Sequence, residues 1–143
     1  MEILFEKGIP GFENYRYFNV NIVEGIKRFY HIVSKEDSNI GFISISPFDI
    51  KKDYEIDLDD EFIKELDIKD EKDVLVICLI TLGKSLKDST ANLKAPIIIN
   101  IKNNRGKQLI LQDDKYKIKE PLECLIQEIK DKVFLKQETT KEN

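Results

Sequence analysis

The sequence predicts a mainly β fold: a small antiparallel β-barrel, or a barrel-like sandwich, with one or two short helices. Short stretches alternate apolar with polar or small residues, and turn-forming residues recur about every eight to twelve positions. Only two stretches repeat their apolar residues with helical spacing. The 143 residues suit one domain, which can bury a core without metals or disulfides.

The first half of the chain is expected to hold four strands, over residues 2–6, 15–22, 28–33 and 40–46. Two glycines and a proline within residues 8–12 demand a tight turn with at least one positive φ. Pro47 ends the fourth strand.

Residues 49–73 form an acidic segment with twelve carboxylates against five lysines, a net charge of −7, whereas the whole chain carries −4. Such a segment repels nucleic acid and attracts a basic protein. Taken alone, its simpler interpretation is a solvated face that aids solubility.

A short amphipathic helix is predicted over residues 59–66 of the acidic segment. Leu58, Phe62 and Leu66 recur at every fourth position, and an aspartate on either side of Leu58 is available as N-cap. The outer face of this helix is expected to carry the charged side chains of Asp60, Glu61, Lys64 and Glu65.

The second half of the chain begins with its longest apolar run, residues 74–82, which predicts a central strand. A compact polar loop over residues 90–96 follows. The β-branched run after Pro96 predicts a strand over residues 97–101 that is buried on both faces.

A hairpin should join that strand to residues 107–111, with asparagines and Gly106 supplying the positive φ values of its turn. A last short strand is expected over residues 116–119. A helix starting at Pro121 then has its apolar face at Leu122, Leu125, Ile126, Ile129 and Val133. We expect a single domain over residues 1–135 and a polar, frayed tail over 136–143.

Residues that carry catalysis or bind metals are sparse. His31 is the single histidine and lies in a predicted strand, which favours a structural or surface role. Cys78 and Cys124 have no metal-ligand spacing and are expected to be reduced structural thiols. No phosphate-binding loop or nucleophile motif occurs, and no cofactor or metal is expected.

The chain has neither a signal peptide nor an apolar run of the ~20 residues that a membrane helix needs, so a cytoplasmic protein is expected. By elimination the residues favour a binding protein. A small ligand-handling enzyme on a β-barrel and an RNA-binding module remain as alternatives, although the latter lacks a basic groove.

Two motifs carry a resemblance to a known family. They are Gly8-Ile9-Pro10-Gly11-Phe12-Glu13 and Thr90-Ala91-Asn92-Leu93-Lys94-Ala95-Pro96-Ile97-Ile98-Ile99-Asn100. Together with Phe29, residues 34–37, Phe42, Pro47, residues 108–111 and Tyr116, they resemble the flagellar assembly factor FliW family. The resemblance spans residues 3 to about 119 and does not extend to the segment after Pro121.

The resemblance implies a non-enzymatic cytoplasmic barrel, monomeric when free, with two protein partners. One is flagellin, bound before export. The other is CsrA, a basic dimeric RNA-binding protein that represses flagellin translation and is antagonised once export frees the FliW-like protein. No direct contact with nucleic acid or membrane is implied.

The acidic segment thereby gains a candidate role, because charge complementarity steers association with a cationic protein such as CsrA. Asn92 and Lys94 lie in the polar loop, where partner recognition and local backbone capping are equally open. The candidate partner-binding residues are Asp57, Asp60, Glu61, Glu65, Asn92 and Lys94.

Overall fold

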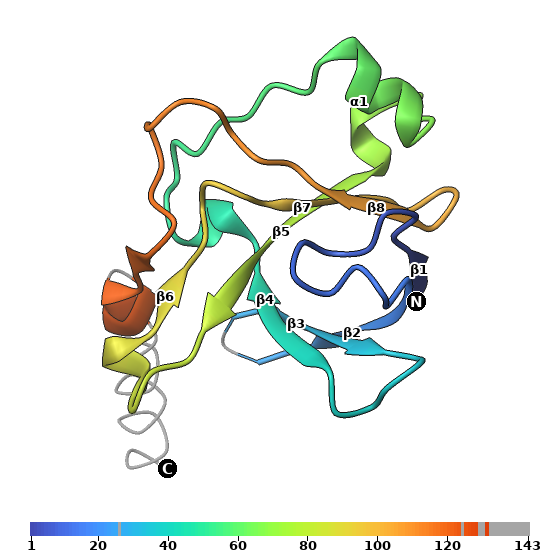
Figure 1. Cartoon of the computed structure of the whole chain (residues 1–143). Coiled ribbons are helices and arrows are strands. Elements are labelled where there is room, and N and C mark those ends of the chain that lie inside the picture. Colours follow the sequence, from blue (N-terminus) through green and yellow to red (C-terminus); the bar gives the residue numbers. More distant parts are fainter. Residues whose placement is uncertain (26, 124, 129–130, 132–143) are drawn as a thin grey trace, which may run out of the picture.

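A closed β-barrel forms the body of the molecule in the computed structural model, which describes residues 1–25, 27–123, 125–128 and 131 (Figure 1). Seven strands follow the order β4-β3-β2-β1-β8-β7-β5, and β5 pairs again with β4 to close the ring. Their bounds are Glu2–Leu4 (β1), Tyr17–Val23 (β2), Phe29–Ser34 (β3), Gly41–Ile45 (β4), Val74–Thr81 (β5), Ile97–Asn100 (β7) and Arg105–Gln108 (β8).

The ladders of the barrel are antiparallel except where β1 runs parallel to β8 through Leu4 and Arg105. The predicted fold class is therefore confirmed, with one parallel pairing in an otherwise antiparallel barrel. Two further strands, β6 (Thr90–Ala91) and β9 (Glu120–Pro121), extend the sheet outward from β5.

Helical structure is short and lies outside the barrel. The helix α1 (Asp60–Glu65) lies beside β8 at one end of the molecule (Figure 1). Three 3₁₀ turns accompany it, η1 (Pro47–Asp49), η2 (Glu71–Asp73) and η3 (Leu86–Asp88). Within the described residues, no helix is long and apolar enough to cross a membrane.

Strand β7 is buried on both faces, as the isoleucine run predicted. Ile97 and Ile99 point into the barrel and join its interior cluster, whereas Ile98 points outward beneath Phe62 and Leu66 of the α1 region. All three isoleucines are fully buried. The strand thus joins the barrel interior to the layer that carries α1.

Positive φ values occur in the first motif as predicted, at Gly8 (68°) and Gly11 (89°). In the β7–β8 turn, however, the positive φ belongs to Asn104 (58°). The expectation that Gly106 supplies one there is wrong. Gly106 is needed for space, because a Cβ atom would lie 2.6 Å from the ring of Phe5.

The predicted strand over residues 116–119 is absent, because the backbone there forms a bend and a turn and has no ladder partner along its length. Tyr116 packs on Tyr54 instead, with ring centroids 4.4 Å apart. The chain covers the outside of the barrel there and joins the sheet only at β9. The first two residues of the expected 90–96 loop form β6 instead. Such two-residue strands have no periodicity from which they could be predicted.

The C-terminal helix begins after Pro121, which belongs to β9 rather than to the helix. Leu122 and Leu125 are fully buried, in agreement with the predicted apolar face. The remaining predictions for this region, concerning Cys124, Ile129, Val133 and the tail over 136–143, lie outside the described residues.

Candidate protein-binding surfaces

The acidic face of α1 is held on the barrel by a cap and by apolar packing. Asp59 is the N-cap and its carboxylate accepts a hydrogen bond from the Phe62 amide at 2.8 Å. Phe62 and Leu66 are buried against Ile98. Asp60 and Glu61 are therefore exposed on the outer side of the helix, as predicted.

The C-terminal end of α1 is fixed by the last residue of the second motif. The buried side chain of Asn100 donates through Nδ2 to the carbonyl oxygens of Leu66 (2.9 Å) and Asp67 (3.2 Å). Asn103 donates to Leu66 as well, at 2.9 Å. Sequence reasoning missed this role; the available signal was a polar residue ending an otherwise apolar, buried strand.

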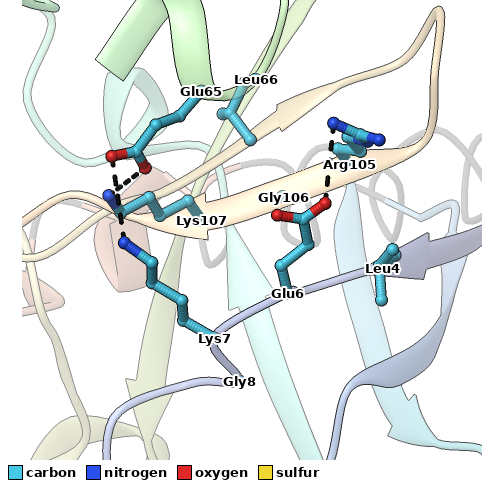
Figure 2. Close-up of a pocket in the computed structure, with 9 residues that line it drawn as sticks. All are labelled: Leu4, Glu6, Lys7, Gly8, Glu65, Leu66, Arg105, Gly106 and Lys107. Atoms are coloured by element: carbon cyan, nitrogen blue, oxygen red, sulfur yellow. Dashed lines mark hydrogen bonds and ion pairs between the residues drawn. The ribbon is translucent and has the colours of Figure 1, made fainter. Parts of the chain in front are cut away.

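Glu65 differs from Asp60 and Glu61, although all three were expected on the outer face. Its carboxylate turns back toward β8, accepts a hydrogen bond from Lys107 and lies 3.9 Å from Lys7 Nζ (Figure 2). The Lys107 hydrogen bond lowers the pKa of Glu65 below its usual range. Glu65 therefore anchors α1 to the barrel, and only a third of its side chain remains exposed (32%).

Asp57 is exposed in the segment that leads into α1. Among the described residues it forms no ion pair. It borders a groove of about 620 Å³ between the acidic segment and the outer side of β5. Three predicted residues, Asp57, Asp60 and Glu61, thus present unneutralised charge on the layer that carries α1.

The two sequence motifs meet at one mouth of the barrel, although more than seventy residues separate them. A cleft of about 550 Å³ lies between Ile9, Pro10 and Phe12 of the first motif and Asn92, Lys94 and Ala95 of the second. The exposed side chains of Ile110 and Ile118 also line it. This juxtaposition could not be predicted from the sequence, because it depends on barrel closure.

Asn92 shapes the loop at this mouth. Its Oδ1 accepts hydrogen bonds from the amides of Lys94 (3.2 Å) and Ala95 (3.1 Å), and its own amide donates to the Leu79 carbonyl at 2.9 Å. The local capping that the sequence left open is therefore present. The Asn92 side chain also lines the cleft. Its role as a cap is therefore compatible with the predicted contact to a partner.

Lys94 extends from the same loop to the Asp114 carboxylate, with Nζ and Oδ1 2.8 Å apart. Gln108 donates through Nε2 to the Ala95 carbonyl at 2.9 Å, which ties the loop to β8. These contacts hold Asn92 and Lys94 in fixed positions beside the cleft.

Two of the three residues considered for chemistry, His31 and Cys78, have ordinary structural surroundings. His31 is exposed on β3. Cys78 is fully buried, and burial raises the pKa of its thiol to about 12. A neutral thiol is a poor nucleophile, so Cys78 acts as a core residue, as predicted.

Comparison with known proteins gives one consistent result. The family model described as FliW protein matches residues 1–122. The flagellar assembly factor FliW of Clostridium botulinum (strain Okra / Type B1) is 51% identical over 122 residues, which cover 84% of each chain. That of Clostridioides difficile (strain 630) is 45% identical over 122 residues, covering 85% of this chain and 94% of the relative.

A solved structure has the same fold. The crystal structure of a flagellar assembly factor FliW superposes with a TM-score of 0.77 at 40% sequence identity, covering 85% of this chain and 84% of that one. The barrel, its two converging motifs and these relatives lead to one assignment: the chain belongs to the FliW family of flagellar assembly factors.

Proposed function

We propose that this protein binds flagellin in the cytoplasm and, when export removes flagellin, binds the translational regulator CsrA and relieves repression of flagellin synthesis. The observation that carries this proposal is the similarity to proteins named flagellar assembly factor FliW, which extends over most of both chains. The protein acts by binding and not by catalysis.

The acidic face of α1 is the proposed contact for CsrA. Asp57, Asp60 and Glu61 lie exposed on a layer packed firmly against β7, so their charges are presented in fixed positions. A basic partner is attracted to such a surface, and complementary charge raises its association rate. The same charge opposes direct binding of this protein to RNA.

The cleft at the barrel mouth is the proposed contact for flagellin, with Asn92 and Lys94 as participants. Both family motifs border it, and exposed Ile110 and Ile118 offer apolar area to a partner. The loop is held by internal hydrogen bonds, and a surface ordered before binding loses little entropy when a partner arrives.

Gel filtration of the purified protein with flagellin and, separately, with CsrA tests the proposal. We expect a 1:1 shift to larger size with each partner. Substituting Asp60→Lys together with Glu61→Lys should abolish the shift with CsrA and leave that with flagellin. Failure of the wild-type protein to shift with either partner would refute the proposal for that partner.

A further inference from the structure

The groove beside α1 has an apolar floor that the fold leaves open. Val74 and Val76 point into it from the outer side of β5, and Ile63 and Ile68 come from α1 and the turn that follows. Each of these side chains is half-buried, as is Leu58 on the opposite wall. At about 620 Å³, the groove falls in the size range of pockets that bind small molecules, so it can take in a few side chains of a partner.

The rim of the groove is acidic, and one of its carboxylates, that of Asp70, also accepts a hydrogen bond from the Lys72 amide at 3.0 Å. Asp57, Asp70 and Glu71 line it, and within the described part of the chain none of them forms an ion pair. Among the described residues, the cation that lines the groove is Lys69, and it is paired with Asp67 at 2.9 Å. A visiting group at this rim therefore meets a negative potential.

The groove is preformed. The turn that ends α1 places Asp67 in the left-handed region (φ 52°) and closes with a 3.0 Å hydrogen bond from the Ile68 amide to the Ile63 carbonyl. Asn100 holds the same turn from the barrel side. An occupant would therefore not have to order the walls on binding.

We propose that this groove receives a protein segment that carries aliphatic side chains flanked by lysine or arginine. The aliphatic side chains cover the floor and the cations pair with the rim carboxylates. The identification of that segment as part of CsrA rests on the proposed function; the chemistry of the groove does not. RNA and anionic membranes fit poorly, because the carboxylates of the rim repel their phosphates. Neither of them would cover the apolar floor of the groove.

The charge of the rim is tested by Asp57→Lys, with Glu123→Lys as the matched control. Both positions are exposed, both substitutions change the net charge equally, and Glu123 lies outside the groove. The apolar contact is tested by Leu58→Ala, with Ile22→Ala as the control, since Ile22 is exposed on β2 (52%). Thermal melting verifies that each variant is folded.

Binding to purified CsrA is measured for all five proteins by calorimetry. We expect each groove variant to weaken binding by about tenfold, whereas the control variants stay within about twofold of wild type. Should CsrA bind the groove variants as tightly as wild type, the groove would not be its contact and Asp57 would drop out of the acidic contact, while Asp60, Glu61 and the proposed function would stand.

A synthetic peptide in which two leucines alternate with two lysines tests the groove independently of CsrA. Wild type should bind it, Asp57→Lys should bind it about tenfold more weakly, and a peptide with glutamate in place of lysine should not bind. If the peptide fails to bind wild type, or binds Asp57→Lys equally well, the groove proposal is wrong. If CsrA fails to bind wild type while the peptide binds, the CsrA part of the proposed function is wrong and the groove stands.

Discussion

At the scale of single residues, two asparagines of the second motif do different work with the same side chain. Asn92 uses its oxygen as an acceptor and folds the loop at the barrel mouth around itself. Asn100 uses its nitrogen as a donor and holds the last carbonyls of α1. Each serves one of the two proposed binding surfaces.

For Asn92, capping and partner contact can be separated by two substitutions. Asn92→Ala removes the oxygen that accepts from Lys94 and Ala95, so we expect a loss of about 1 kcal/mol in the free energy of unfolding. Asn92→Asp keeps an acceptor oxygen and should melt close to wild type.

The predicted contact appears as weaker flagellin binding by Asn92→Asp, because a carboxylate cannot donate to a partner as the amide does. The expected loss is about 1–3 kcal/mol if a partner acceptor is left unpaired. Chemical denaturation and calorimetry on both variants give the answer. If Asn92→Asp binds flagellin as tightly as wild type, Asn92 only caps the loop and does not contact the partner.

Among the secondary-structure elements, α1 decides the role of the acidic segment. Its placement determines whether this segment forms a binding surface or only a solvent-exposed face. Its cap, its apolar side and the Asn100 contacts fix it to β7. These contacts fix the positions of the outer carboxylates of α1. Loosening the helix should therefore weaken binding of the partner, although the charge of α1 is unchanged.

Asn100→Ala tests that dependence. Removing Nδ2 leaves the Asp67 carbonyl without this donor, and we expect about 1–3 kcal/mol less stability together with faster hydrogen exchange in α1. Asn103→Ala is the control, since that residue is exposed and donates to Leu66 alone among the last carbonyls of α1, while its Oδ1 accepts from the Arg105 amide at 3.2 Å. Equal effects of the two substitutions would contradict a special role for Asn100.

The charge of α1 is tested by Asp60→Lys with Glu61→Lys. Both side chains are exposed, so the fold should melt as wild type while the on-rate for CsrA falls. The wild-type on-rate should decrease between low and high salt, and that of the variant should depend on salt much less. An on-rate unchanged by charge reversal would exclude α1 from the encounter.

Glu65 must be left out of that substitution. Reversing it would place a cation beside Lys7 and Lys107, and the resulting repulsion would disturb the attachment of α1 to the barrel. Glu65→Gln is the suitable variant, because it keeps the shape of the side chain and removes only its charge.

Local signals made α1 and β7 predictable. Regular apolar spacing and an aspartate cap defined α1, and β-branched residues after a proline defined β7. The β1–β8 pairing and the bond between Glu65 and Lys107 were not predictable, because each joins positions far apart in the chain. The exposure of Asp60 and Glu61 on α1 was thus predicted from the sequence. The anchoring of Glu65 to Lys107 and the meeting of the two motifs were not.

At the scale of the whole molecule, the barrel wall is buried from two sides. Interior residues such as Ile97 and Ile99 fill the barrel, and an outer layer that includes α1 covers Ile98. One rigid wall thereby supports both the mouth cleft and the acidic face. Damage to that wall should remove both proposed activities together.

Ile98→Asp is the corresponding prediction. An unpaired carboxylate at this fully buried position costs several kcal/mol, a large part of a typical stability of ~5–15 kcal/mol, so we expect an unfolded protein. Ile101→Asp is the control, because Ile101 follows β7 and is 45% exposed. Circular dichroism melts compare the two; a cooperative transition near wild type in Ile98→Asp would show that the wall tolerates the charge.

The proposed exchange between flagellin and CsrA on this protein can be followed in one titration. Fluorescently labelled leader RNA of the flagellin transcript is bound to CsrA, and its anisotropy is followed while this protein and then flagellin are added. We expect this protein to release the RNA from CsrA and added flagellin to restore the CsrA–RNA complex. RNA that stays bound to CsrA throughout, or release that flagellin does not reverse, would contradict it.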